Sequence, residues 1–566
     1  MRKEFVVKKK KVVIIGGVAA GPKVGSRIIR LEPDTDVTLI EKGEFLSYAG
    51  CGLPYYISGV VKEQKELMST PVGTVRDTVF FQSVKNVHVY NYTEALSIDR
   101  NNKKVNIRTL KTGKEKILDY DILVLATGAA PINPPVKGRE LKNIFTLHGV
   151  EDAEGIKAFF SEKNAQNVTI VGGGLIGIEM AEAFHMLGAC VTIVERLPQI
   201  LSFLDEDIAV LVSKHLLEKG VKVKTNTTVT AFEGDGKVEK VVTDKGAFES
   251  DIVIIAVGVR PNVILAKEAG LNIGQTGAIE VNEHMQTSDP SIYAAGDCVQ
   301  TRNLLTGKIC YMPLGSTANK QGRVAANNIC GKKDVFSGVL NTAICKVFDY
   351  GVGVTGLSEK QAKKEGYDIV TVLSPSPDRA HFYPTAKPIM MKLVVEKESR
   401  KLLGVQSIGS GDVDKRIDIA VTAITAGMTI DQIANLDLSY APPYSPAMDN
   451  IITSVNIARN KLDGIYEAIS PQEVKEKIER NDDFIFLDVR SPQEYETIKI
   501  ANTMLIPLGK LRKECENLPK NKEIITFCKI SLRGYEAALI LKARGFSNVK
   551  VMDGGIMMWP YSLIQK

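Results

Sequence analysis

The sequence predicts an α/β protein of several domains, and a repeated pattern, the length and the composition support this prediction. Residues 11–41 and 168–195 each read as a strand, a glycine-rich turn, a helix and a second strand that ends on an acidic residue. A length of 566 residues corresponds to three or four domains at roughly 150 residues each. With 44% hydrophobic and 24% charged residues, the composition is typical of a soluble globular chain and excludes a disordered or fibrous one.

Charge and cysteine content exclude several classes of protein. The net charge of +6 is small for this length, so neither a nucleic acid nor a membrane is expected as a partner. The basic N-terminal segment runs straight into the first glycine turn, so it is interpreted as leading into a strand and not as a signal peptide. The eight cysteines are scattered without a CxxC spacing, which favours a cytoplasmic location and argues against a structural metal site.

The second repeat carries the stronger motif. Gly172, Gly174 and Gly177 form a G-x-G-x-x-G pattern directly after a strand. The first glycine makes a tight turn, the second lets the backbone approach a pyrophosphate, and the third lets the helix pack on the strand. Glu195 follows at the position where a carboxylate binds a ribose diol. The motif therefore predicts a dinucleotide site, although an ordinary glycine-rich turn is the alternative.

The first repeat is weaker when it is taken alone, because Val18 stands where the middle glycine normally lies. The same alternative, an ordinary glycine-rich turn, carries more weight here. Two such units in one chain nevertheless predict two dinucleotides, for which FAD and a nicotinamide form the natural pair. The candidate cofactor residues of the first repeat are Gly16, Gly17, Val18, Gly21, Glu41 and Lys42.

Three further segments support a flavoprotein. Residues 122–131 and 252–261 read as buried strands that close on glycine turns, and residues 287–299 place an aspartate after a short strand. Over about residues 10–455 these motifs resemble the two-dinucleotide flavoprotein disulfide reductases. The resemblance implies FAD together with NADH or NADPH. The additional candidate cofactor residues are Thr127, Gly128, Gly258 and Asp297, of which the aspartate would bind the flavin ribitol.

The rest of the chain adds two domains by resemblance. Residues 334–455 correspond to the interface domain of those reductases, which implies a homodimer, and the motifs LDVRSPQEYE, FCKISLRG and DGGIMMW resemble a rhodanese domain. The expected fold is thus two Rossmann-like dinucleotide-binding domains, an α+β dimerisation domain and a C-terminal α/β rhodanese domain. The expected ranges are 1–152 and 261–333 for FAD, 153–260 for NAD(P)H, 334–455 for dimerisation, 456–466 for a linker and 467–566 for rhodanese.

Cys51 is the first candidate nucleophile. It lies between two glycines and three residues before Pro54, which predicts a sulfur at a helix N-terminus, where amides and the helix dipole stabilise a thiolate. Inert packing is the alternative. Disulfide reductases of the common type carry a second cysteine five residues later, but Tyr56 occupies that position, so an intramolecular disulfide is excluded there.

A single redox cysteine beside a flavin implies one of two subfamilies. It forms a mixed disulfide with a small thiol in coenzyme A-disulfide reductases and a sulfenic acid in NADH oxidases and peroxidases. The latter enzymes carry a histidine in the first glycine loop, where this chain has Ala19, so peroxide chemistry is disfavoured. The chain most closely resembles fusions of coenzyme A-disulfide reductase with rhodanese, some of which reduce persulfides or polysulfide with NADH.

A basic helix face is consistent with coenzyme A as a substrate or bound ligand. Lys23, Arg27 and Arg30 recur at helical spacing after the first glycine loop, so they share one face. By resemblance they would contact the coenzyme A nucleotide, together with Ser47 and Gly50. A solvated helix face is the alternative.

Two tyrosines are further candidates by resemblance. Tyr440 matches a tyrosine that reaches the active site of the opposite subunit, and Tyr383 matches a second one, although Phe382 could be aligned there instead. Such phenols can donate a proton to a departing thiolate. Packing at a subunit interface is the alternative for both.

Cys528 is the second candidate nucleophile. It stands at a strand end before a loop and a helix, so loop amides and Arg533 would form an anion cradle around a thiolate that carries sulfane sulfur. A buried core cysteine is the alternative. Asp488 and Arg490, in the preceding motif, are expected to be structural.

The sequence as a whole predicts an FAD-dependent NAD(P)H oxidoreductase. Cys51 would reduce coenzyme A disulfide, persulfides or polysulfide, and Cys528 would relay sulfane sulfur. The rivals are an NADH oxidase or peroxidase, a sulfurtransferase whose flavoprotein half is regulatory, and a flavin-binding redox sensor. The physiological acceptor and the route between the two sulfurs stay open.

Overall fold

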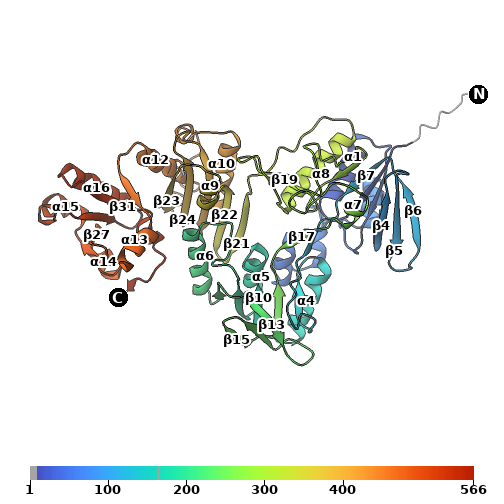
Figure 1. Ribbon diagram of the computed structural model, residues 1–566, viewed down its shortest axis with the longest axis horizontal. Helices are drawn as coiled ribbons and strands as arrows, with labels where there is room; N and C mark the ends of the chain where they lie inside the picture. The colour runs from blue at the N-terminus through green and yellow to red at the C-terminus, as the bar shows by residue number, and fades with distance from the viewer. Residues whose placement is uncertain (1–8, 164, 566) are drawn as a thin grey trace, which may run out of the picture. The chain divides into compact units, whose positions relative to one another are not determined.

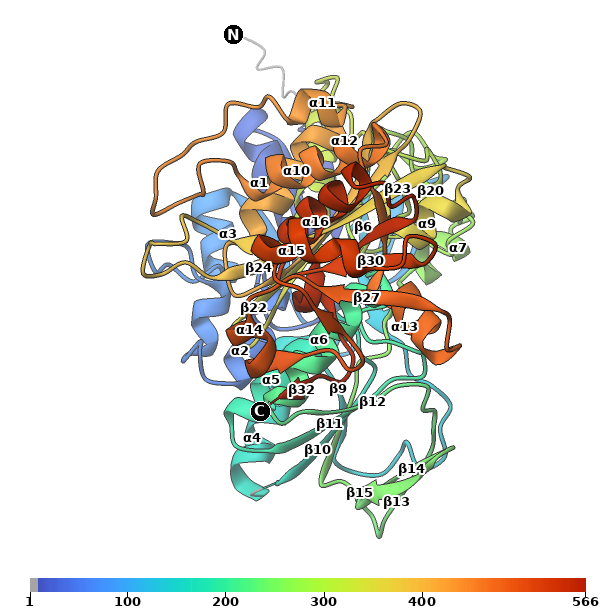
Figure 2. The same ribbon diagram turned by 90° about the vertical axis from the view of Figure 1, so that its left-hand side faces the viewer.

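The computed structural model describes residues 9–163 and 165–565. Residues 1–8, which belong to the expected first domain and carry most of the basic N-terminal segment, lie outside the described part, as do residues 164 and 566. The chain folds into two compact units, and their elements are labelled in Figure 1 and seen from a second direction in Figure 2. The first unit runs to residue 198 and continues over 224–339, and the second contains 199–223 and 340–566.

A parallel sheet in the order β18-β7-β1-β2-β3 carries the first glycine loop. Side chains on β1 point alternately to opposite faces, and Val12, Val13 and Ile14 are all buried, so both faces of the sheet are covered. Its strands are Lys11–Ile15 (β1), Asp36–Ile40 (β2), Val87–Tyr90 (β3), Ile122–Leu125 (β7) and Ile292–Ala294 (β18), and its helices include Ala20–Leu31 (α1), Thr78–Lys85 (α3) and Gly315–Ile329 (α8).

A second parallel sheet repeats this arrangement for the second glycine loop, with β11, β10, β16 and β9 in that order. Its elements are Ile144–Thr146 (β9), Asn167–Val171 (β10), Cys190–Val194 (β11), Ile252–Ile255 (β16), Val150–Lys163 (α4) and Leu175–Met186 (α5). Antiparallel pairs and triplets complete the unit: Thr93–Asp99 (β4), Lys104–Thr109 (β5), Glu115–Asp119 (β6), Ala129–Pro131 (β8), Val229–Glu233 (β13), Lys240–Thr243 (β14), Gly246–Glu249 (β15) and Val259–Pro261 (β17). The strands expected within residues 122–131, 252–261 and 287–299 are confirmed.

The second unit begins with an antiparallel sheet in the order β21-β22-β25-β24-β23. Its strands are Ala343–Val347 (β21), Tyr350–Gly356 (β22), Ile369–Pro377 (β23), Pro388–Glu396 (β24) and Leu402–Gly409 (β25). The accompanying helices are Glu206–Glu218 (α6), Glu359–Lys364 (α9), Val413–Thr425 (α10), Ile430–Ile433 (α11) and Asn450–Leu462 (α12).

A buried lysine ties α6 to this sheet, although α6 comes from the range expected to bind the nicotinamide. The Lys392 ammonium of β24 lies 2.8 Å from the Asp207 carboxylate, 2.7 Å from that of Glu359 and 3.3 Å from that of Asp205. Burial opposes the charge, but the three carboxylates raise the pKa of Lys392, so the ammonium stays charged. Such a group is stable in the interior only because it is fully paired.

A parallel sheet in the order β26-β31-β30-β27-β29 forms the C-terminal part of the second unit. Its elements are Glu467–Ile469 (β26), Phe484–Asp488 (β27), Met504–Leu505 (β29), Glu523–Phe527 (β30), Val549–Met552 (β31), Pro471–Glu479 (α13), Pro492–Thr497 (α14), Leu508–Glu514 (α15) and Leu532–Ala543 (α16). Asp488 and Arg490 form a buried ion pair at 2.6 Å, which confirms the structural role expected for them.

The range 456–466, expected to be a linker, is mostly helical, because α12 continues to Leu462. Tyr466 is already buried in the C-terminal core, where its ring packs against that of Tyr535. Only residues 463–465 therefore connect the last helix of the dimerisation range to the final sheet. In the described ranges, no helix combines the length and the apolar composition needed to cross a membrane.

Candidate active site

In the first glycine loop, two glycines lie so close to other backbone atoms that no side chain would fit. A Cβ atom on Gly16, which has a φ of +114°, would lie 2.0 Å from the Ala126 carbonyl oxygen, and one on Gly21 would lie 1.9 Å from that of Gly16. The Glu41 carboxylate accepts hydrogen bonds from the amides of Gly17 (2.6 Å) and Gly43 (2.8 Å). The acid is therefore held at the edge of the loop, where a ribose would bind.

The second loop has the same construction. A Cβ atom on Gly172 would lie 2.4 Å from the Ala256 carbonyl oxygen, and one on Gly177 would lie 2.1 Å from that of Gly172. The Glu195 carboxylate accepts from the Gly173 amide (2.7 Å) and the Leu197 amide (2.8 Å). Because both loops open into helices of twelve residues, their N-terminal amides can face a phosphate.

The remaining candidate cofactor residues lie at tight turns or at open positions. A Cβ atom on Gly174 or on Gly128 would meet nothing within 4 Å, so these positions border open space. Gly258 also has a positive φ, of +107°, at the corresponding turn of the second sheet. The Thr127 hydroxyl donates to the Asn262 carbonyl (2.7 Å), and the Asn262 amide returns a bond to the Thr127 carbonyl (2.9 Å).

Asp297 follows β18 at the carboxyl edge of the first sheet. Burial raises the pKa of its carboxyl, and the nearby His148 opposes the shift. Its backbone is held firmly, since the Tyr311 hydroxyl donates to its carbonyl (2.7 Å) and the Gln321 side chain accepts from the preceding Gly296 amide (2.9 Å). Among the residues that the structure describes, none donates a hydrogen bond to the carboxylate, which suits a ligand hydroxyl such as that of a flavin ribitol.

Cys51 lies on an exposed turn, Gly50–Gly52 (η1), that leads directly into the short helix Leu53–Ile57 (α2). The segment just before this turn is bonded to the first glycine loop, because the Ser47 amide donates to the Gly17 carbonyl (2.8 Å). Ser47 itself adopts a left-handed conformation (φ +48°), which turns the chain toward the cysteine. The structure thus binds Ser47 to the predicted flavin loop, with Gly50 and Cys51 following along the chain, and Cys51 is a free cysteine.

Two of the three basic side chains on the predicted face of α1 already form hydrogen bonds within the protein. The Arg27 side chain donates to Asn327 of α8 (2.9 Å), and the Arg30 side chain donates to the Ser26 carbonyl of its own helix (2.8 Å). Lys42, predicted to be a cofactor residue, is exposed and forms an ion pair with Glu94 (2.8 Å). Coenzyme A binding by Lys23, Arg27 and Arg30 stays a prediction.

A buried arginine holds the two segments that carry the candidate tyrosines. Arg416 is fully buried; its guanidinium donates to the Asp378 carbonyl (2.6 Å) and to the Asp449 carboxylate (3.0 Å). Asp378 opens the segment of Tyr383, and Asp449 closes that of Tyr440, whose side chain is 52% exposed. The sequence did not indicate Arg416, because its partners are more than 30 residues away in opposite directions.

Cys528 lies at the end of β30 and is completely buried. The loop that follows bends at Ser531, which has a φ of +78°, and α16 begins at the next residue. A Cβ atom on Gly555 would lie 2.4 Å from the Cys528 carbonyl oxygen, and the Ile556 amide donates to that oxygen (2.9 Å). The predicted arrangement of strand, loop and helix at this cysteine is confirmed.

Arg533 is paired more strongly than the sequence indicated. Its two terminal nitrogens each donate at 2.7 Å to the Glu494 carboxylate, and this bond, followed by the charge of Cys528, raises the pKa of Arg533. Glu494 was missed as a site residue because its motif, S-x-x-E from Ser491, also forms a helix capping box. The arginine therefore contacts both the cysteine loop and an acid that fixes it.

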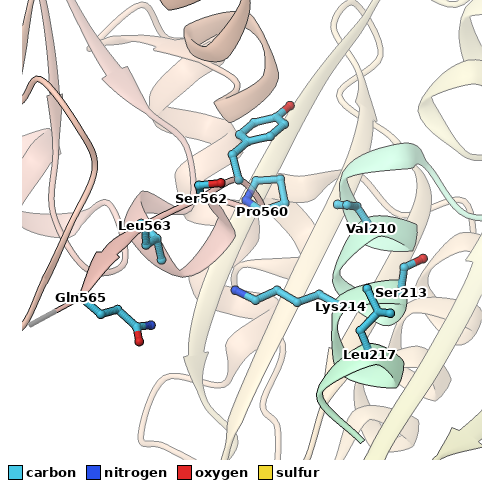
Figure 3. Close-up of a pocket in the computed structure, with 9 residues that line it drawn as sticks. Val210, Ser213, Lys214, Leu217, Pro560, Ser562, Leu563 and Gln565 are labelled. Atoms are coloured by element: carbon cyan, nitrogen blue, oxygen red, sulfur yellow. The ribbon is translucent and has the colours of Figure 1, made fainter. Parts of the chain in front are cut away.

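A shallow pocket of about 400 Å³ lies elsewhere in the second unit. Figure 3 shows Lys214 extending from α6 toward the C-terminal segment that carries Ser562 and Gln565. None of the candidate site residues lines this pocket, so it is not part of the candidate active site.

Comparison with known proteins agrees with this geometry. Residues 10–322 match the family described as pyridine nucleotide-disulphide oxidoreductase, and residues 342–452 match its dimerisation domain. The chain belongs to the pyridine nucleotide-disulphide oxidoreductase family. Residues 470–560 match the rhodanese-like domain. The predicted fold class is confirmed, and so are the predicted cofactors, because this oxidoreductase family depends on FAD and uses NAD(P)H.

Three relatives illustrate the similarity. The NAD(P)H coenzyme A polysulfide/persulfide reductase of Pyrococcus horikoshii is 41% identical over 80% of this chain and 99% of its own length. The structure of an NAD-dependent persulfide reductase from A. fulgidus has a TM-score of 0.93 at 47% identity and covers 97% of this chain and 100% of that one. Reduced CoADR-RHD of Bacillus anthracis has a TM-score of 0.92 at 37% identity, covering 97% and 98%.

The Glu494–Arg533 pair predicts a specific acid sensitivity of the rhodanese-like domain. The hydrogen bond from Arg533 lowers the pKa of Glu494 from 4.5 to about 2. A carboxyl group whose pKa is lowered by folding contributes stability that is fully present above its ordinary pKa. This stability is lost as the pH falls through the pKa of the group in the folded protein. Glu494→Gln should therefore show a smaller fall in the unfolding midpoint than the wild-type protein between about pH 5 and pH 2.5.

Emission from Trp559 measures this transition, because it is the single tryptophan of the chain and is buried in this domain. Glu496→Gln is the matched control, since Glu496 is exposed on the same helix and should follow the wild-type profile. Identical pH profiles for Glu494→Gln and the wild-type protein would contradict the assignment.

Proposed function

We propose that this protein reduces low-molecular-weight disulfides and persulfides with NAD(P)H, through Cys51 as the one redox cysteine of the flavoprotein part. The observation that carries this proposal is the Ser47–Gly17 hydrogen bond, which joins the Cys51 turn to the first glycine loop. Cys51 is exposed and free, so an external sulfur can reach it. The names of the Pyrococcus, A. fulgidus and Bacillus relatives support coenzyme A-linked and persulfide substrates.

Different residues would bind the two nucleotides and react with the substrate sulfur. Gly16, Gly17 and Glu41 would hold the adenosine half of FAD, and Asp297 would hold its ribitol. Bound FAD would pass two electrons from NAD(P)H to sulfur. The second loop, with Gly172 and Glu195, would hold the nicotinamide nucleotide.

Cys51 can complete the reduction of a disulfide without a second cysteine of the protein. The Cys51 thiolate attacks one sulfur of a disulfide, so that one thiolate leaves and a mixed disulfide with Cys51 forms. Two electrons from NAD(P)H then cleave that bond, returning the Cys51 thiolate and releasing the second thiol after protonation. With a persulfide acceptor, the same sequence releases sulfide.

We further propose a homodimer in which Tyr440 and Tyr383 reach the active site of the partner subunit. Tyr440 is half exposed, and so are Tyr444 and Met448 of its own segment and Phe382 next to Tyr383, as expected for surfaces that a second subunit covers. A phenol there can donate a proton to the departing thiolate. Arg416, which joins both segments, would keep the two tyrosines in register.

Cys528 would carry sulfane sulfur as a persulfide. Its complete burial means that a donor must enter through the loop that precedes α16, where backbone amides and Arg533 favour an anion. Bulky or polymeric donors would hand over sulfur there, whereas a small disulfide would react at Cys51 directly.

Cys51→Ser tests the flavin-linked step. The variant should retain FAD and reduction of the flavin by NADH, but turnover with coenzyme A disulfide should fall by more than about 1,000-fold, because an alcohol cannot form a sulfur–sulfur bond. Anaerobic NADH oxidation is the measurement. Cys190→Ser is the matched control, since Cys190 is also exposed and should leave the rate unchanged. Turnover retained by Cys51→Ser would refute the proposal.

Cys528→Ser tests the rhodanese-like step. Reduction of coenzyme A disulfide should persist, whereas sulfur transfer from thiosulfate to cyanide should disappear and reduction of polysulfide should slow. Cys515→Ser is the matched control, because Cys515 is equally buried in the same domain. Equal loss on every acceptor would show that the Cys528 sulfur is obligatory, and unchanged rates on all of them would show that the domain takes no part in reduction.

A further inference from the structure

A buried ion pair connects α12 with the turn that follows β31. The Lys461 ammonium donates to the Asp553 carboxylate and to the Thr371 carbonyl of β23 (2.7 Å). The two charged side chains are only 7% and 8% exposed. Burial raises the pKa of Asp553, and Lys461 together with the Leu373 amide counteracts this effect. Because removal from water is costly for both charges, each depends on the other for its place in the interior.

The turn that begins at Asp553 also holds the Cys528 loop. Gly554 and Gly555 both have positive φ, at +71° and +58°, so the chain reverses sharply after the aspartate. The next two amides, those of Ile556 and Met557, donate to the carbonyls of Cys528 (2.9 Å) and Lys529 (3.2 Å).

The other end of the cysteine loop is hydrogen-bonded to the residue that precedes this turn. The Ser531 hydroxyl donates to the carbonyl of Met552, the residue immediately before Asp553 (3.2 Å). The loop 528–531 is thus bonded at both ends to residues 552–557. A shift of Asp553 would therefore be transmitted to the backbone around the Cys528 sulfur.

We propose that Lys461, in the last turn of α12, is a positioning residue for sulfur transfer at Cys528. By fixing Asp553, it sets the turn that orients the amides of the cysteine loop toward an incoming anion. The inference rests on the proposed function of Cys528. In that reaction the thiolate takes the outer sulfur of thiosulfate and releases sulfite, and the persulfide then gives this sulfur to cyanide as thiocyanate.

Four variants of the full-length protein separate positioning from general stability. Lys461→Met removes the charge at similar volume, and Lys461→Arg keeps a cation that can reach Asp553. Lys461→Met combined with Asp553→Asn removes both charges and restores a neutral, hydrogen-bonding turn. Lys477→Met is the matched control, because Lys477 forms an ion pair with Glu523 at the far end of the strand that leads to Cys528 (2.8 Å).

The expected result is specific to sulfur transfer. Lys461→Met should lower kcat/KM for transfer from thiosulfate to cyanide by about 10- to 100-fold, the range expected when a reacting group is misplaced. Lys461→Arg and the double variant should recover most of it, and Lys477→Met should match the wild-type protein. Anaerobic reduction of coenzyme A disulfide should stay within about twofold in all four, since Cys51 lies outside this turn.

Hydrogen–deuterium exchange supplies a readout that needs no turnover. Peptides covering 528–532 and 553–558 should exchange faster in Lys461→Met than in Lys477→Met, because the loop bonds open more often. Transfer or exchange in Lys461→Met that equals the Lys477→Met values would overturn the inference. A wild-type protein without any sulfur transfer would refute the proposed role of Cys528 itself, and the exchange comparison alone would then decide whether Lys461 fixes the loop.

Discussion

In each glycine loop, one glycine packs closely against backbone at the end of a neighbouring strand. Both predicted nucleotide sites depend on this contact. The Cβ position of Gly16 lies 2.0 Å from the Ala126 carbonyl oxygen, and that of Gly172 lies 2.4 Å from the Ala256 carbonyl oxygen. No side chain fits at such distances, so each loop can bend over the carboxyl end of its sheet only with glycine. The bend directs the following helix N-terminus toward the ligand and leaves an amide free to bind the acid of the next strand.

This constraint also explains why the irregular first motif builds the same loop as the regular second one. The outer glycines are sterically required, whereas a Cβ atom on Gly174, the middle glycine of the second loop, would meet nothing within 4 Å. Val18 can therefore replace the middle glycine without distorting the turn. The sequence motif treats all three glycines as equally necessary, whereas packing in this protein requires only the two outer ones.

The sequence predicted the local features of both units and missed the long-range pairs that position them. Strand, turn and helix around Cys528 follow from neighbouring residues, and so do both nucleotide loops. Arg416 and Lys461 are ordinary helix residues in a sequence, and only folding shows that they bind carbonyls and carboxylates tens of residues away. Within the range expected to be a linker, α12 continues to Leu462, and Lys461 in its last turn pairs with the distant Asp553.

The two candidate nucleophiles, Cys51 and Cys528, differ in their exposure. Cys51 is exposed, four residues after Ser47, whose amide binds the first glycine loop, whereas Cys528 is completely buried at the end of β30. The proposed function uses this difference: Cys51 would reduce disulfides, and Cys528 would hold sulfane sulfur. Because Cys51 would form its mixed disulfide with the substrate, the proposed reaction needs no internal disulfide in the flavoprotein part.

The most direct test of this division is to identify the sulfur that captures the substrate. The protein is treated with a small thiol and desalted, so that Cys51 is free and no NADH is present; it is then mixed anaerobically with one equivalent of coenzyme A disulfide, quenched in acid, and analysed by peptide mass spectrometry. A coenzyme A adduct is expected on the Cys51 peptide, lost again on addition of NADH before the quench, and none on the Cys528 peptide. An adduct on Cys528, or a Cys51 peptide that stays unmodified while the disulfide is consumed, would contradict this division.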